Sequence, residues 1–194
     1  MRGRLDARRT LKSLVADLRM EKKTLRICLV RHGETEENIS RVLQGHMPGR
    51  LTENGRMQII SLRSQLDLND FDVVLSSDLK RVKDTVELLL DGKQIKWLQW
   101  PMFREIDWGS LTGMKIAEVN LQQLPADVET KEMLYDRAGR VADKLRTEYA
   151  GQTVLLVSHG LFLRSLIAHF TGVPVGQLHT VNRMGNGEAR WFEV

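Results

Sequence analysis

Two histidines each follow a short apolar stretch and precede a glycine. The two turns read Arg31-His32-Gly33 and Ser158-His159-Gly160. Short apolar runs that stop at turn residues are typical of buried strands, and in open α/β sheets ligands bind where the strands end. We therefore expect both imidazoles at one edge of a sheet, where the glycines let backbone N–H groups approach a ligand closely.

These residue types suit the transfer of a phosphoryl group. A phosphomonoester is a dianion whose oxygens need fixed hydrogen-bond donors, and the guanidinium groups of Arg31 and Arg81 offer planar, two-point contacts. A neutral imidazole can attack phosphorus, which divides one difficult step into two easier ones. The leaving alkoxide then needs a proton, so a carboxylic acid must stand near the bridging oxygen. The sequence contains no metal-binding cluster such as HExxH or paired CxxC.

The elements that must position these groups alternate between strands and helices. The apolar pattern predicts strands at 25–31, 71–76 and 153–157, and two short strands at 177–181 and 188–192. It predicts helices at 52–66, 78–90, 134–149 and 161–170, and a broken stretch at 95–127. Thr52 is the expected cap of the first helix and Ser76 or Ser77 that of the second, which places Arg81 in a first turn. This alternation predicts an α/β fold, a three-layer sandwich whose mostly parallel sheet carries helices on both faces.

The length of 194 residues fits one domain with an appendage. Residues 1–24 carry eight Lys and Arg residues against three Asp and Glu, whereas the whole chain has a net charge of +4. The body, residues 25–194, is therefore close to neutral, and we expect it to bind neither nucleic acid nor a membrane. We predict that the leader is flexible or loosely helical; an organellar presequence and a true start at Met20 are the alternatives.

Cys28 is the single cysteine of the chain and lies in an apolar run. We expect its thiol to be buried and unreactive. A lone cysteine cannot form an internal disulfide, which favours a reducing compartment, and we predict a cytoplasmic protein.

The two histidine turns belong to an ordered series of short motifs. In chain order the series reads Arg31-His32-Gly33-Glu34-Thr35, Asn38, Gln44-Gly45, Leu51-Thr52-x-x-Gly55-x-x-Gln58, Ser76-Ser77-Asp78-Leu79-x-Arg81, Glu105-x-x-x-Gly109 and Ser158-His159-Gly160. A single tripeptide match is weak evidence, whereas this order and spacing are specific. The series resembles the signature of the histidine phosphatase superfamily, which includes phosphoglycerate mutases, fructose-2,6-bisphosphatases and α-ribazole phosphatases. The resemblance implies a phosphoglycerate mutase-like domain over residues 25–194.

The resemblance also implies roles for five matching residues. His32 is the nucleophile, and its ring carries the phosphoryl group between the two steps. Arg31, Arg81 and His159 hold the phosphoryl oxygens, with His159 as a cation during transfer. Glu105 is the acid of the first step and activates water in the second.

Further residues near these motifs receive weaker assignments. The resemblance gives Asn38, Gln44 and Gly45 hydrogen bonds to the phosphate or to the entering group, and it implies no metal and no other cofactor. Arg164, which follows the last motif, is interpreted as an exposed helix residue outside the site. The tryptophans of the broken stretch are expected in the core or the pocket wall; they are Trp97, Trp100 and Trp108.

The segment between Glu105 and His159 decides between hydrolysis and transfer. A mutase must keep its phosphohistidine away from water, and the resemblance associates that task with a longer insertion here. Residues 111–131 form a short cover with only Lys115 and Lys131 as cations. We therefore predict a metal-independent phosphatase that acts on a small phosphorylated metabolite. A phosphoglycerate mutase-type transferase and a catalytically weak phospho-ligand-binding or scaffold protein are the alternatives.

Two departures from the family pattern bear on specificity. Residues 46–52 read His-Met-Pro-Gly-Arg-Leu-Thr where many relatives have Asp-x-Pro-Leu-Thr, and residues 128–130 read Val-Glu-Thr in place of Gly-Glu-Ser. We expect both departures in the shell that faces the substrate, with Arg50 either at the pocket rim or in water. The substrates left open are sugar phosphates, a ribazole-type nucleotide, phosphoglycerates and phosphoprotein side chains.

Overall fold

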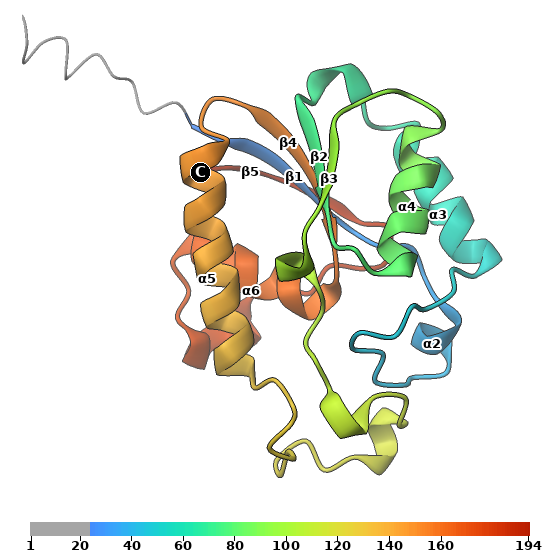
Figure 1. Ribbon diagram of the computed structural model, residues 1–194, viewed down its shortest axis with the longest axis vertical. Helices are drawn as coiled ribbons and strands as arrows, with labels where there is room; N and C mark the ends of the chain where they lie inside the picture. Colours follow the sequence, from blue (N-terminus) through green and yellow to red (C-terminus); the bar gives the residue numbers. More distant parts are fainter. Residues whose placement is uncertain (1–23) are drawn as a thin grey trace, which may run out of the picture.

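The computed structural model describes residues 24–194, so all of the predicted leader except Thr24, including Met20, lies outside the described residues. A five-stranded sheet forms the centre (Figure 1). In spatial order its strands are β3 (Trp97–Gln99), β2 (Val73–Ser76), β4 (Thr153–Ser158), β1 (Arg26–Arg31) and β5 (Ala189–Glu193). β5 runs antiparallel to β1, and the other pairings are parallel. The predicted mostly parallel α/β sheet is confirmed.

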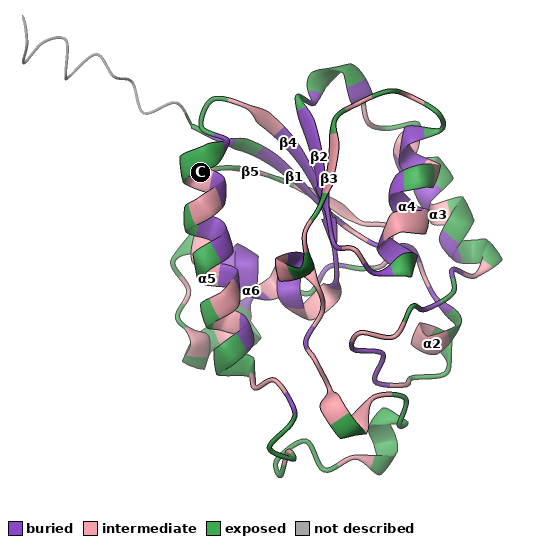
Figure 2. Ribbon diagram, viewed as in Figure 1, coloured by how far each residue is buried: buried purple, intermediate pink, exposed green. Residues whose placement is uncertain are grey.

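Helices cover both faces of this sheet because successive strand residues point to opposite sides. On β4, Val154 and Leu156 pack in one cluster with α5 (Lys131–Glu148) and α6 (Gly160–Thr171). Leu155 and Val157 pack in a second cluster with α3 (Glu53–Arg63) and α4 (Lys80–Leu90). Figure 2 shows the central strands buried between the two helical layers. Both faces must therefore be apolar, which explains why these strands read as continuous apolar runs.

Threonine side chains cap three of the helices, and the predicted cap of α3, Thr52, is confirmed. Thr52 Oγ1 accepts a hydrogen bond from the Gly55 N–H at 2.8 Å at the start of α3. Thr130 does the same for the Met133 N–H at the start of α5, at 3.2 Å. Thr35 caps the short helix α2 (Glu36–Ile39) in a capping box. These caps fix where the chain turns away from the sheet edge.

Three predictions about elements are wrong. Residues 177–181 form no strand, because the chain after Pro174 winds into the 3-10 helix η5 (Val175–Thr180), in which the Gln177 N–H bonds to the Pro174 carbonyl. The stretch predicted as broken contains β3, whose three residues pair with β2. α4 begins at Lys80 with Leu79 at the N-cap position, and no serine side chain caps it.

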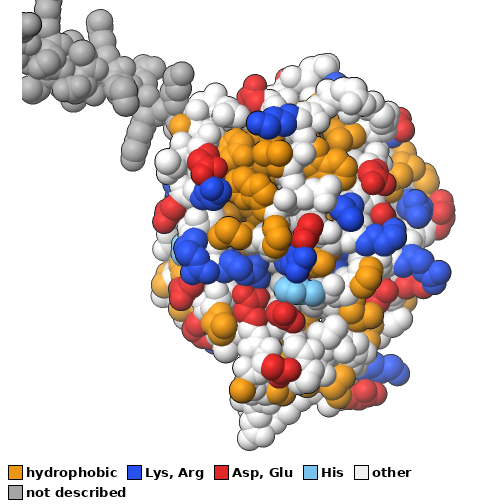
Figure 3. All heavy atoms as spheres, viewed as in Figure 1, with side chains coloured by type: hydrophobic (Ala, Val, Ile, Leu, Met, Phe, Trp, Pro, Cys, Tyr) orange, Lys and Arg blue, Asp and Glu red, His pale blue; other side chains and the backbone are white. Residues whose placement is uncertain are grey.

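Two further properties of the described part of the chain complete this picture. The predicted burial of the Cys28 thiol is confirmed, and burial raises its pKa to about 12. Among residues 24–194, no helix has the length and apolar character needed to cross a membrane. Figure 3 shows hydrophobic side chains beside β3 on one face, with basic and acidic side chains mixed below them.

Candidate active site

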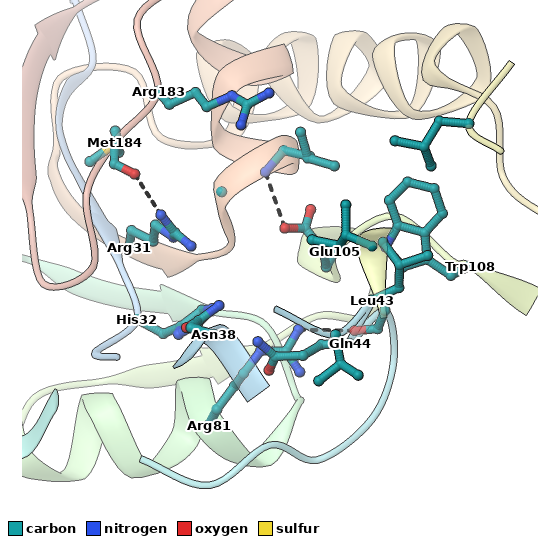
Figure 4. A pocket seen from close by; sticks show the side chains of 16 residues that line it. Arg31, His32, Asn38, Leu43, Gln44, Arg81, Glu105, Trp108, Arg183 and Met184 are labelled. Carbon is teal, nitrogen blue, oxygen red and sulfur yellow. Dashed lines mark hydrogen bonds between the residues drawn. The ribbon is translucent and has the colours of Figure 1, made fainter. Parts of the chain in front are cut away.

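A cavity of about 410 Å³ opens at the carboxyl edge of the sheet (Figure 4). Its wall includes the carboxyl end of β1, the loop after α2, the start of α4, the segment after β3 and the start of α6. Its polar lining residues are Arg31, His32, Asn38, Gln44, Arg81, Glu105 and Arg183. The cavity therefore brings together four of the five residues predicted to be catalytic.

His32 follows β1 directly, and its side chain is almost completely buried at 3% exposure. Its Nδ1–H donates a hydrogen bond to the Gly33 carbonyl at 2.8 Å; a carbonyl oxygen can only accept, so Nδ1 carries the proton. Burial lowers the pKa of His32 well below its usual value, and the nearby charges of Arg81 and Arg31 lower it further. The ring is therefore neutral, with its lone pair on Nε2.

The turn that carries His32 packs directly against the backbone of α3. A Cβ atom on Gly33 would stand 2.6 Å from the Gly55 carbonyl oxygen, and a Cβ atom on Gly55 would collide with the Glu34 carbonyl oxygen. The two glycines thus permit a backbone-to-backbone contact that no other residue allows. The contact fixes the turn at His32 relative to the first turn of α3.

Arg81 lies in the first turn of α4 and is 1% exposed. Its Nη1 donates to the Met47 carbonyl at 2.5 Å and its Nη2 to the Gly45 carbonyl at 2.9 Å, while its Nε has no partner in the described protein. Burial lowers the pKa of Arg81 to about 10. A buried guanidinium held only by carbonyls, without a carboxylate partner, is expensive unless an anion binds beside it.

Arg31, at the end of β1, approaches the cavity from the opposite side (Figure 4). Its Nη1 donates to the Met184 carbonyl at 2.8 Å, and its buried Nε has no partner among the described residues. Burial lowers its pKa, Glu105 opposes that shift and Arg183 adds to it. Both arginines therefore line the cavity without a carboxylate partner, and each keeps a buried Nε–H that is unpaired among the described residues.

Glu105 lies at the amino end of α6, where free backbone N–H groups point outward. Its Oε1 accepts from Phe162 at 3.0 Å and from its neighbour Ile106 at 3.1 Å, and its Oε2 accepts from Leu161 at 3.1 Å. The carboxyl group is thus fixed at the cavity wall by backbone donors. This placement puts a carboxyl group in the same cavity as the His32 ring.

Two residues that the sequence did not single out hold the backbone of Glu105. Arg137 of α5 donates to the carbonyls of Met102, Arg104 and Glu105, and it forms a bidentate ion pair with Glu129. His46 donates from Nε2 to the Glu105 carbonyl at 3.0 Å. An arginine inside a long helix carries no local signal of such a role, so sequence reasoning missed it.

His32 and His159 meet at one edge of the sheet, as the two strand ends predict, but only His32 lines the cavity. His159 is completely buried and does not line the cavity; its ring lies behind that of His32, with centroids 5.3 Å apart. Its Nε2 shares a hydrogen bond with the Ser77 hydroxyl at 2.9 Å, and its Nδ1 has no partner in the described residues. Burial lowers the pKa of His159 well below its usual value, and the charges of Arg81 and His32 lower it further, so the ring is neutral.

The three residues with weaker assignments all line the cavity. The Asn38 side-chain oxygen is shared by Thr35 and by the amide of Asn186, so that oxygen already serves the fold. The Gln44 side-chain oxygen is buried and has no partner in the described part of the protein. Gly45 adopts φ +47°, and its carbonyl holds Arg81.

The structure corrects several expectations about the surroundings. Neither Arg50 nor residues 128–130 line the cavity, so these departures from the family pattern do not face the substrate there. Arg50 is exposed to water, in agreement with the second of its two alternatives, and pairs with Glu36, whereas Thr130 caps α5. Arg164 is not a free surface residue, because its guanidinium binds the carbonyls of Val181 and His179.

Arg183 and a set of apolar residues complete the lining, and the sequence indicated only Trp108 among them. Arg183 is exposed in the irregular segment between η5 and β5, which has no periodicity to mark it. Trp97 and Trp100 lie outside the lining, and Trp100 stacks on Phe103 at 5.1 Å in the core. Among residues 24–194, no group of three or more His, Cys, Asp or Glu is arranged to hold a metal ion.

Comparison with known proteins places this site in a family. Residues 27–194 match the family model described as the histidine phosphatase superfamily, branch 1. The adenosylcobalamin/alpha-ribazole phosphatase of Salmonella typhimurium is 30% identical over 79% of this chain and 83% of its own. The probable phosphoglycerate mutase GpmB of Proteus mirabilis is 30% identical over 77% of this chain and 76% of its own. The solved structure of YhfR from Bacillus stearothermophilus superposes with a TM-score of 0.81 at 27% identity, covering 88% of this chain and 91% of that one. The chain therefore belongs to the histidine phosphatase superfamily.

Proposed function

We propose that this protein hydrolyses the phosphomonoester of a small metabolite through a phosphohistidine at His32, without a metal ion. One observation carries the proposal: a neutral imidazole with its lone pair on Nε2 stands in the same cavity as two arginines that lack carboxylate partners. Such a cavity attracts a phosphate dianion and presents a nucleophile to it.

In the first step the Nε2 lone pair of His32 attacks phosphorus, and a P–N bond forms as the P–O ester bond breaks. The bonding electrons move to the leaving oxygen, which takes a proton from Glu105. Arg31 and Arg81 bind the phosphoryl oxygens through their free N–H groups, and a bound dianion favours the cationic form of His159 behind the ring. The Gly33 carbonyl keeps its bond to Nδ1–H throughout.

In the second step water attacks the phosphohistidine. Glu105, now a carboxylate, takes a proton from the water, the P–N bond breaks, and its electron pair returns to Nε2. Inorganic phosphate leaves, and His32 is again neutral. The segment over the cavity is short and exposed at Ile116 and Leu121, which supports water rather than a second organic group as the acceptor.

The proposal includes two statements about the whole chain. The chemistry belongs to residues 25–194, and the basic leader takes no part in it. The protein acts in the cytoplasm, a location supported by the single, buried thiol of Cys28.

The experiment traps the intermediate on the full chain. The protein is mixed for milliseconds with 32P-labelled p-nitrophenyl phosphate and quenched in base, which preserves phosphohistidine, and the labelled peptide is sequenced. We expect label on His32, none in His32→Ala, and turnover of wild type that vanadate inhibits. Label at another residue overturns the proposal. Phosphate binding without any turnover identifies the binding-protein alternative, and faster transfer to 3-phosphoglycerate than to water identifies the mutase.

A further inference from the structure

The cavity has a second half that the phosphoryl chemistry does not use. We call it the apolar wall; it consists of Val42, Leu43, Trp108, Ile116, Leu121 and Leu161. We infer that the apolar wall selects phosphomonoesters whose alcohol carries a large apolar group, such as a long alkyl chain or an aromatic ring. This inference rests on the proposed phosphatase function and names the substrate class of that site.

The two arginines that the proposed mechanism uses mark the phosphate end of the cavity. Arg31 and Arg81 offer their free N–H groups there, and the Asn38 oxygen is already shared by two neighbours. A sugar or glycerate would place several hydroxyl or carboxylate groups against the apolar wall, where its six side chains offer one indole N–H and no acceptor. Buried hydroxyls without partners weaken binding, so polar alcohols are disfavoured.

The apolar wall is exposed in a way that calls for a ligand. Ile116 is 41% exposed and Leu121 is 48% exposed, although both line the cavity. Large apolar side chains grouped at the mouth of a pocket are a common mark of a binding site. A carbon-rich alcohol would cover these side chains and remove their surface from water.

Backbone pairing holds the two sides of the apolar wall together before any substrate arrives. The Leu43 N–H donates to the Met114 carbonyl at 2.9 Å, and the Gly113 N–H donates to the Leu43 carbonyl at 2.8 Å. The Ile116 N–H donates to the Arg41 carbonyl at 2.9 Å. The wall is thus preformed, and an apolar substrate pays little to order it.

Arg183 favours a different class of substrate from the apolar wall, namely one with a second negative charge. It is the one cationic lining residue outside the phosphate end in the described chain, and in Figure 4 it lies beside Met184, away from Trp108. A substrate with a second anionic group, such as a phosphoglycerate, would approach Arg183. The test must therefore compare the effect of a longer alkyl chain on the substrate with the effect of a second negative charge.

The test uses primary alkyl phosphates whose leaving alcohols have nearly the same basicity: ethyl, butyl and hexyl phosphate, beside 3-phosphoglycerate. We expect kcat/KM to rise roughly threefold for each methylene that reaches the apolar wall, mainly through KM. Leu121→Ser should lower the hexyl-to-ethyl ratio by at least about threefold. Met57→Ser is the matched control, because Met57 is 53% exposed on α3 outside the cavity, and it should leave the ratio unchanged.

A binding series separates this inference from the proposed function. Ethyl-, butyl- and hexylphosphonate cannot be hydrolysed, and calorimetry gives their Kd values whether or not the protein is catalytic. Affinity that rises with chain length and falls in Leu121→Ser supports the apolar wall, even if no ester is turned over. A flat series, or a preference for 3-phosphoglycerate that Arg183→Ala abolishes, overturns the inference while phosphatase activity stands.

Discussion

The two halves of the cavity are built in opposite ways. The phosphate end comes from strand ends and first helical turns, and its residues are mostly buried: His32 is 3% exposed and Arg81 is 1% exposed. The apolar wall comes largely from loops, and Leu121 is 48% exposed. In the proposed mechanism the helices and strands thus carry the chemistry, whereas the loops select the substrate. A common phosphoryl-transfer step can therefore be combined with different substrates by changing the loops alone.

Changing the phosphate end should have the largest effect. Arg81→Lys keeps the charge but loses the planar contact with two carbonyls and with phosphate, so we expect kcat/KM to fall by about 10²–10³-fold for every ester. Steady-state kinetics on ethyl and hexyl phosphate measure this. Lys80→Ala is the control from the same helix turn, since Lys80 is exposed and pairs with Asp84. A loss confined to hexyl phosphate would show that Arg81 selects rather than catalyses.

The buried histidines should make the phosphate end sensitive to acid. Folding holds the pKa values of His32 and His159 below that of the unfolded chain, which binds more protons below about pH 6.5. Stability is therefore complete above that pH and is lost as the pH falls toward the folded pKa values. Between pH 7 and 5.5 we expect urea denaturation to show a loss of about 1–3 kcal/mol.

Variants assign that loss to the buried rings. His159→Gln should remove roughly half of the change in unfolding free energy between the two pH values, whatever its effect at pH 7. His179→Gln, at an exposed position, should leave the change intact. An unchanged acid response in His159→Gln would mean that other groups cause it.

The support behind Glu105 should have an intermediate effect. Arg137→Ala removes one of the two side-chain donors to the Glu105 carbonyl and leaves only His46, so the acid is held less firmly. We expect kcat to fall about tenfold on alkyl phosphates, which need a proton on the leaving oxygen, and less on p-nitrophenyl phosphate, which does not. Exposed Arg140→Ala on the same helix is the control. Equal losses on both substrates would indicate a general structural defect.

Arg50 should have the smallest effect of the four. Its side chain is 74% exposed and pairs with Glu36, and exposed ion pairs contribute little. Arg50→Ala should change kcat/KM by less than about twofold, at both low and high salt. A larger, salt-dependent loss for 3-phosphoglycerate would extend the selective half of the cavity to this loop.

The same contrast explains what the sequence could reveal. β1 and β4 are buried on both faces, so continuous apolar residues mark them, and each ends at a histidine of the site. The positions of His32, Arg81 and Glu105 around one cavity were predictable because they lie at such ends or in an ordered motif series. The strand β3 was not predictable from the sequence. It has only three residues, which pair only with β2 and are too few to show an alternating apolar pattern.

The remaining parts depend on contacts that the chain forms only after folding. His159 lies behind the cavity because the Ser77 hydroxyl holds its ring, and no spacing encodes that direction. Residues 177–181 are predicted as a strand, but the turn after Pro174 makes residues 177–180 part of a 3-10 helix. Arg183 enters the cavity from an irregular segment, where residue type alone does not distinguish it from a surface arginine.

The contact between Gly33 and Gly55 limits how the protein can be stabilised. Replacing a helical glycine with alanine ordinarily gains up to about 1 kcal/mol and is a standard thermostabilising change. At Gly55 the added methyl group would meet the Glu34 carbonyl and push the neighbouring turn out of place. An engineering library for this protein should therefore leave position 55 alone, although helix propensity would rank it first on α3.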